Sequence, residues 1–132
     1  FKVLGEWNLM YDKKKLLIFQ GRIHLYEGNN LSDCVLPVLL TRMVGCNKII
    51  FTNAAGGVNK DFSPGDFMLV ESFNSINIKK ELTELIGISS LETKNNFLNC
   101  PSSKMNKIFK ETADETGINL QSGTYWDTKG PS

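Results

Sequence analysis

A run rich in β-branched and aromatic residues at 48–52 (Lys-Ile-Ile-Phe-Thr) constrains the fold of this chain more than any other segment. β-Branched and aromatic residues without polar alternation predict a strand covered on both faces, as in parallel sheets. Ahead of this run, apolar residues recur at helical spacing over 31–44, and a strand is expected over 16–19 that runs on through 20–26. The order strand, helix, strand implies a right-handed crossover between parallel strands. We therefore predict an α/β fold with a mixed, largely parallel sheet flanked by helices.

Turn and cap residues mark the other elements. Asn30 or Ser32 can cap the first helix, and Gly45 follows its end, while Pro37 must lie in an early turn or kink the helix. Pro64-Gly65-Asp66 is a turn signal. Near the start of the chain, strands over 9–11 and 16–19 are predicted to form a hairpin around a polar turn at 12–15. A strand is predicted over 67–71, followed by a long loop over 72–102 with one short helix near 80–86. A helix over 103–116, which Ser102 or Ser103 caps and Gly117 ends, and a last strand over 119–126 complete the predicted elements.

Composition and charge exclude several classes of function. The 132 residues fit one domain, predicted here as a single partial domain over 1–132. A net charge of +1 gives no general attraction to nucleic acid or to an anionic membrane, and no apolar segment reaches the ~20 residues of a membrane helix. The lone His24 and the three cysteines, which contain no Cys-x-x-Cys pair, do not have the spacing of metal ligands. The cysteines, Cys34, Cys46 and Cys100, are expected to be reduced, which predicts a reducing, cytoplasmic compartment. Any bound anion must therefore be held locally.

Three polar side chains share one face of the strand expected over 20–26. Arg22, His24 and Tyr26 stand at positions i, i+2 and i+4, and alternation along a strand places such residues on the same side. Arginine offers a planar fork of donors that suits phosphate, and histidine can add another donor. The alternative is an exposed strand face with a surface ion pair to Glu27. The spacing indicates an anion site without naming the anion.

A second candidate segment, Thr52-Asn53-Ala54-Ala55-Gly56-Gly57, follows directly after the expected buried strand. In open α/β sheets, ligands bind at the carboxyl ends of strands, and small residues let backbone N–H groups approach them. The alternative is a tight turn that needs small residues. No Gly-Lys-Ser/Thr follows, so the segment is not a P-loop for nucleoside triphosphates.

Three stretches taken together resemble the purine nucleoside phosphorylase family of the trimeric type. They are Gln20-Gly21-Arg22-Ile23-His24-Leu25-Tyr26-Glu27-Gly28, Thr52-Asn53-Ala54-Ala55-Gly56-Gly57-Val58-Asn59 and Pro64-Gly65-Asp66-Phe67-Met68-Leu69. Gly123-Thr124-Tyr125 and Gly130-Pro131-Ser132 resemble later stretches of the same family. The resemblance implies phosphate attack at C1′ of a purine nucleoside, which gives free base and ribose 1-phosphate or its deoxy form.

The resemblance also implies roles for particular residues. Arg22 and His24 would bind the phosphate, with help from the backbone N–H of Ala54, and Glu27 would hydrogen-bond His24 and fix its orientation. The catalytic set would thus be His24, Arg22 and Glu27. Contacts to the nucleoside would come from Tyr26, Asn53, Ala55 and Gly56. Inorganic phosphate is the co-substrate, so no cofactor and no metal is expected.

The resemblance leaves alternatives and implies an assembly. A methylthioadenosine phosphorylase, a hydrolytic nucleosidase and a non-catalytic homologue that only binds nucleoside remain open. The family forms homotrimers. Both ends read as cut, because no initiator methionine is present and Gly130-Pro131-Ser132 directly follows an expected strand. The chain is therefore expected to be an internal fragment, inactive by itself, whose purine-reading residues follow Ser132.

Overall fold

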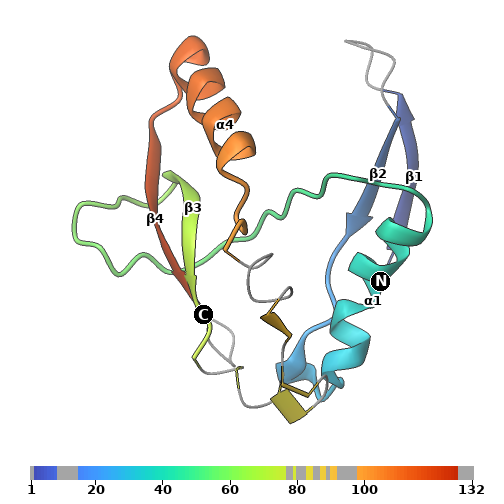
Figure 1. Cartoon of the computed structure of the whole chain (residues 1–132). Helices are drawn as coiled ribbons and strands as arrows, with labels where there is room; N and C mark the ends of the chain where they lie inside the picture. Colours follow the sequence, from blue (N-terminus) through green and yellow to red (C-terminus); the bar gives the residue numbers. More distant parts are fainter. Residues whose placement is uncertain are drawn as a thin grey trace. The chain divides into compact units, whose positions relative to one another are not determined.

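The computed structural model divides the chain into two compact units, Phe1–Asn53 and Ala54–Ser132 (Figure 1). It describes residues 2–8, 15–76, 79, 83–84, 87–88, 90–91 and 98–127. Each unit holds one two-stranded sheet and one longer helix among these residues. The prediction of a single domain over 1–132 stays a prediction.

The first unit opens with a β-hairpin. Strand β1 (Lys2–Asn8) pairs antiparallel with β2 (Lys15–Gln20), from Lys2 opposite Gln20 to Asn8 opposite Lys15, with an irregularity between Val3 and Glu6. A hairpin is present, as predicted, and β2 contains the predicted strand over 16–19. Strand β1 precedes the predicted first strand, whose residues 9–11 lie outside the described part of the chain.

The predicted continuation of β2 through residue 26 is wrong. The strand ends at Gln20 because Gly21 has a φ of 86°, a left-handed conformation that leaves the β region and that glycine adopts without strain. Residues 22–24 are irregular, and a short 3₁₀ helix, η1 (Leu25–Glu27), follows. Gly28, with a φ of 85°, closes this turn by donating its N–H to the carbonyl oxygen of Leu25 at 3.0 Å. A sharp turn therefore replaces the expected strand.

Helix α1 (Leu31–Met43) confirms the predicted helix. Asn30 is its N-cap, and the Asn30 carbonyl oxygen accepts hydrogen bonds from the N–H groups of Asp33 and Cys34. Pro37 lies inside the helix, where the missing N–H leaves one helical hydrogen bond unmade. Thr41 is the buried residue of this helix, and its hydroxyl donates to the Val38 carbonyl oxygen at 2.7 Å.

The strand predicted over 48–52 is wrong, because the structure has neither strand nor helix over residues 46–58. Ile50 and Phe51 are 60% and 65% exposed. An apolar run becomes a buried strand only when other strands pair with it and other layers cover it, and no strand among the described residues pairs with this run. The crossover predicted between the first strand and this run is therefore wrong as well.

The second unit contains a parallel pair of strands. Strand β3 (Phe67–Asn74) pairs with β4 (Leu120–Trp126), from Phe67 opposite Leu120 to Asn74 opposite Trp126, with an irregularity between Val70 and Ser72. The ring centroids of Phe73 and Tyr125 lie 6.4 Å apart, edge to face. The chain is thus α/β with a parallel pair, as predicted, but this pair uses later segments, and residues 72–74 belong to β3 rather than to the predicted loop.

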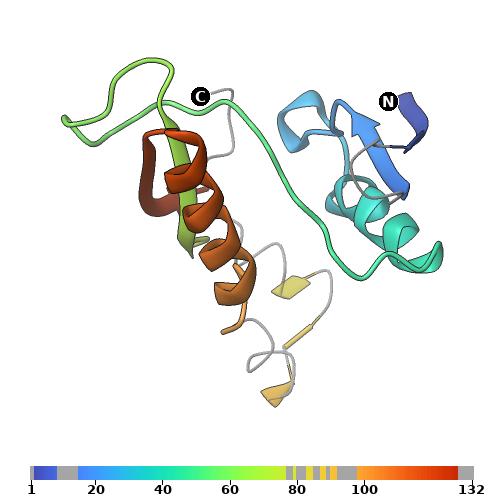
Figure 2. The same cartoon turned by 90° about the horizontal axis from the view of Figure 1, so that it is seen from above.

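Helix α4 (Ser103–Thr116) connects the two parallel strands and has the predicted bounds. The Ser102 hydroxyl accepts a hydrogen bond from the Met105 N–H at 3.3 Å, and Gly117, with a φ of 69°, ends the helix. Figures 1 and 2 show α4 lying along the β3–β4 pair. The helix predicted near 80–86 falls mostly on residues outside the described ranges.

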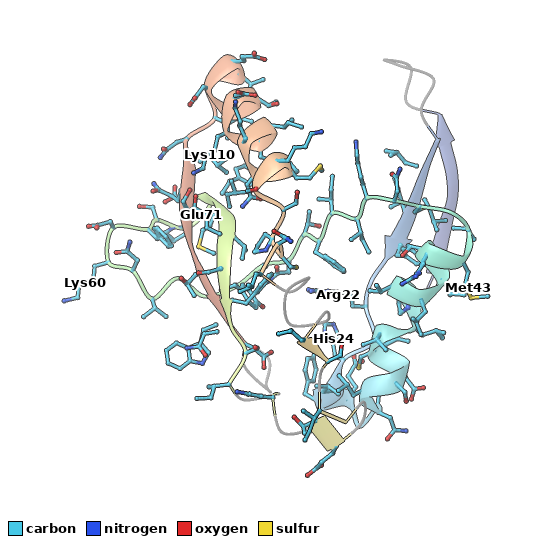
Figure 3. The ribbon with its side chains drawn as sticks, in the orientation of Figure 1. Arg22, His24, Met43, Lys60, Glu71 and Lys110 are labelled. Carbon is cyan, nitrogen blue, oxygen red and sulfur yellow. The ribbon has the colours of Figure 1, made fainter. Side chains whose placement is uncertain are left out.

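Two polar contacts attach α4 to β3. The Asn106 amide donates to the Val70 carbonyl oxygen at 2.9 Å, and the Lys110 ammonium lies 2.5 Å from Glu71 Oε1 (Figure 3). Asn106 and Lys110 are four residues apart, so both lie on the helix face that meets the sheet. Ala113, the buried residue of α4, lies about two turns after Asn106.

Replacing Asn106 with leucine should lower the free energy of unfolding by about 1 kcal/mol, because the half-buried Val70 carbonyl loses its hydrogen-bond donor. Urea unfolding followed by circular dichroism measures this change. Lys104→Leu, at an exposed position of the same helix, is the matched control and should change stability less. Equal effects of the two substitutions would show that the Asn106 contact contributes nothing.

Acid should weaken the α4–β3 contact. The hydrogen bond from Lys110, and then its positive charge, lower the pKa of Glu71 below the ordinary 4.5, and a hydrogen bond from Ser122 adds to this effect. A carboxyl with a lowered pKa stabilises the folded state above its unfolded-state pKa, and this contribution is lost as the pH falls through the folded-state value. Between about pH 6 and about pH 3, the thermal midpoint of Glu71→Gln should therefore fall less than that of the unmodified chain.

The control for this acid effect is Glu115→Gln, which removes an exposed carboxylate from the same helix. We expect it to keep the acid dependence of the unmodified chain. If Glu71→Gln also keeps that dependence, the Glu71–Lys110 pair does not stabilise the second unit.

Candidate functional site

Arg22, His24 and Tyr26 come from the turn between β2 and α1. Arg22 is exposed and His24 is half-buried. Both side chains are labelled in Figure 3. The His24 and Tyr26 rings stack, with centroids 4.9 Å apart and planes 25° from parallel. His24 is extended, with φ −114° and ψ 143°, and the 3₁₀ turn then brings Tyr26 back against it. The structure therefore places His24 beside Tyr26, although strand alternation is not the reason.

Hydrogen bonds around His24 hold this turn in place. The His24 backbone N–H donates to Glu27 Oε2 at 3.2 Å, and the Glu27 N–H donates to the His24 carbonyl oxygen at 3.3 Å. The Asn29 amide donates to the His24 carbonyl oxygen at 3.0 Å and to Glu27 Oε2 at 3.4 Å. Glu27 thus contacts His24 as the resemblance implies, but it does so through the backbone N–H.

Asn53, Ala54, Ala55 and Gly56 lie in an exposed irregular segment. The boundary between the two units falls between Asn53 and Ala54. A Cβ placed at Gly56 would meet nothing within 4 Å, so packing within the described structure does not require glycine there. A turn that needs small residues for packing is therefore a poor explanation of this position.

The chemistry of the cysteines argues against a thiol nucleophile near the turn. Burial, and then the negative charges of Asp33 and Glu27, raise the pKa of the Cys34 thiol. A raised pKa keeps the sulfur protonated and weakly nucleophilic at neutral pH. Cys46 and Cys100 are exposed, and all three cysteines are free.

The described ranges contain neither a candidate metal site nor a candidate membrane helix. No group of three or more His, Cys, Asp and Glu side chains there could hold a metal ion. Within the same ranges, no helix has the length and apolar character to cross a membrane.

Two cavities in the described part of the chain have linings that include none of the predicted site residues. One, of about 400 Å³, lies beside α4 and includes Glu71, Asn106 and Lys110. The other, of about 210 Å³, is lined by residues between Val38 and Ile49. Neither is lined by Arg22, His24 or Tyr26. Within the first unit, Arg22 and Tyr26 are exposed and His24 is half-buried.

Asn29 belongs to this site through its hydrogen bonds, although it is not among the predicted site residues. It stands in the stretch Glu27-Gly28-Asn29-Asn30, which reads as a turn cluster. Asparagine in such clusters commonly hydrogen-bonds nearby backbone, and this is the signal that could have identified it.

Similarity to known proteins extends over most of this chain. The family model described as the phosphorylase superfamily matches residues 7–132. Purine nucleoside phosphorylase 1 of Geobacillus stearothermophilus is 31% identical over 121 residues, which are 89% of this chain and 43% of that protein. Purine nucleoside phosphorylase of Anopheles gambiae is 34% identical over 128 residues, 89% of this chain and 35% of that protein. The mouse (Mus musculus) purine nucleoside phosphorylase is 44% identical over 54 residues, 41% of this chain and 19% of its own length. The chain therefore spans less than half the length of these relatives.

Proposed function

We propose that the protein to which this chain belongs cleaves the N-glycosidic bond of purine nucleosides with inorganic phosphate, because the chain belongs to the phosphorylase superfamily. The products are free base and ribose 1-phosphate, or deoxyribose 1-phosphate. The observation that carries this proposal is the turn at residues 22–27, where an exposed Arg22 precedes the His24–Tyr26 stack. It joins a fork of phosphate donors to an aromatic surface suited to a sugar.

Arg22 and His24 bind the phosphate in this proposal, and the Ala54 N–H donates a further hydrogen bond. Arginine supplies a planar pair of donors and a permanent charge, and the His24 ring adds a donor. With a net charge of only +1, this chain attracts an anion through such local groups rather than through its overall field.

Phosphate is itself the nucleophile, so no side chain has to attack the sugar. Its oxygen forms a bond to C1′ as the bond from C1′ to the purine nitrogen breaks, and the electron pair leaves with the base. The sugar passes through a cation-like state, as in other glycosidic cleavages. The protein contributes position and charge beneath that sugar. The raised pKa of the Cys34 thiol fits a mechanism without a cysteine nucleophile.

Tyr26, Asn53, Ala55 and Gly56 contact the nucleoside in this proposal. The Tyr26 ring is half exposed and rests on His24, so it can face a sugar while His24 faces phosphate. Glu27 acts through the backbone of His24. No cofactor or metal enters the reaction. A cytoplasmic location and a homotrimer follow from the family resemblance and belong to the same proposal.

Incubation of the full-length protein with inosine or guanosine, with and without phosphate, tests this function. We expect release of base only with phosphate, and ribose 1-phosphate as the sugar product on chromatography. Full activity without phosphate, with free ribose as product, would instead identify a hydrolase. Binding of nucleoside without release of base would identify a non-catalytic homologue. Preferential cleavage of methylthioadenosine would place the chain in that branch of the family.

A further inference from the structure

The Asn29 side chain closes a ring of hydrogen bonds around the backbone of His24. Its amide nitrogen donates to the His24 carbonyl oxygen at 3.0 Å and to Glu27 Oε2 at 3.4 Å, while Glu27 Oε2 also accepts the His24 N–H at 3.2 Å. One amide thus contacts both the residue that stacks on Tyr26 and the carboxylate that holds it. Asn29 is half-buried, although Glu27 and Gly28 are exposed.

The ring matters for binding an anion. Glu27 lies three residues from His24 and carries a negative charge that opposes a phosphate bound nearby. Two N–H donors on Glu27 Oε2 offset part of that charge and hold the carboxylate against the backbone. Without the Asn29 amide, Glu27 retains one of these donors, and the His24 carbonyl loses its side-chain donor.

We propose that Asn29 is a positioning residue of the phosphate site, which holds His24 against Tyr26 and keeps the Glu27 carboxylate paired with donors. This inference rests on the proposed function. Asn29 acts through His24 and Glu27 and does not itself contact the substrate. The role requires a side-chain amide, because a carboxylate of the same shape would repel Glu27 instead of donating to it.

The kinetic test compares two adjacent substitutions that add the same charge. Asn29→Asp removes the amide donor, whereas Asn30→Asp changes the N-cap of α1, where the Asn30 side chain makes no capping hydrogen bond and aspartate is equally favourable. In the full-length protein, Asn29→Asp should raise KM for phosphate about tenfold, and Asn29→Ala about fivefold, the factors expected for one or two lost hydrogen bonds. Asn30→Asp should leave KM for phosphate within about twofold.

The split between KM and kcat separates positioning from general damage to the fold. A variant that only destabilises the protein lowers the amount of active enzyme, and hence the apparent kcat, without changing KM for phosphate. Equal KM values for Asn29→Asp and Asn30→Asp, or a loss confined to kcat, would overturn the inference.

A second measurement does not depend on catalysis. His24 is the single histidine of the 132 residues, so its ring Cε1–H proton gives one histidine resonance in an NMR spectrum of this chain. Without phosphate, Asn29→Ala should shift that resonance and Asn30→Ala should not. An unchanged resonance in both variants would overturn the inference. A different result would contradict the proposed function rather than the role of Asn29. In that case the His24 resonance of the unmodified chain does not shift on addition of phosphate, and the full-length protein releases no base.

Discussion

Replacing Arg22 with alanine in the full-length protein should lower kcat/KM for phosphorolysis by about a hundredfold or more. The substitution removes a charged fork of donors from the proposed phosphate site, and the loss of one well-placed donor to developing charge costs about 2–4 kcal/mol of transition-state stabilisation. Steady-state rates at varied phosphate concentration measure the effect. The kcat/KM of Arg22→Lys should lie between that of the unmodified protein and that of Arg22→Ala, because lysine keeps the charge but loses the planar pair of donors.

The matched control is Arg42→Ala. Arg42 is the other arginine of the chain, and it is exposed in the last turn of α1. Its removal makes the same change in net charge, so any effect of the protein's overall field should be similar for both variants. Near-normal phosphate saturation and turnover in Arg22→Ala, or equal losses in both variants, would contradict the role of Arg22.

Replacing Ala54 with proline should have the next largest effect, a fall of about a hundredfold in kcat/KM. Proline has no backbone N–H, so this change deletes the one donor that Ala54 contributes to phosphate in the proposal. Ala54→Gly keeps that N–H and should retain most of the activity. The same phosphate-dependent rates compare the two variants.

A proline also stiffens the chain around it, so a second control is needed. Val58→Pro places the same ring in the same irregular segment, at a residue that is 97% exposed and outside the proposed site. We expect it to leave phosphorolysis nearly unchanged. If Val58→Pro is as damaging as Ala54→Pro, or if Ala54→Gly is equally inactive, the Ala54 N–H has no special role.

Elements that depend on nearby residues were predicted well. Helix α4 has the predicted bounds because Ser102 caps its first turn and Gly117 ends its last turn, and both signals are local. Helix α1 begins at the predicted residue 31 and ends one residue before the predicted 44, which is also close agreement. The turn before β3 was also foreseen: Gly65 has a φ of 97°, and the Ser63 N–H donates to Asp66 Oδ2 at 2.9 Å.

The pairing of distant segments was predicted poorly, although strands were predicted at both β3 and β4, over 67–71 and 119–126. The apolar run at 48–52 has every local mark of a strand, but a strand exists only when another strand pairs with it, and the sequence of one segment does not contain that information. The parallel pair was therefore expected at the wrong place. It forms between β3 and β4, whose pairing spans a long stretch of chain.

The candidate site was predicted in part, and for a partly wrong reason. His24 and Tyr26 do lie together, but a turn that begins at Gly21 brings the rings together, not the alternation of a strand. A glycine inside a strand pattern is a known signal for such a break. Asn29 escaped notice because its contacts depend on the geometry of the 3₁₀ turn, which the residue pattern did not predict.

A crystal structure of the full-length protein with phosphate tests the central claim, that residues of this turn bind the anion, most directly. We expect one phosphate with oxygens about 3 Å from the Arg22 guanidinium, the His24 ring and the Ala54 N–H. A phosphate bound elsewhere, with Arg22 and His24 directed into solvent, would contradict the claim.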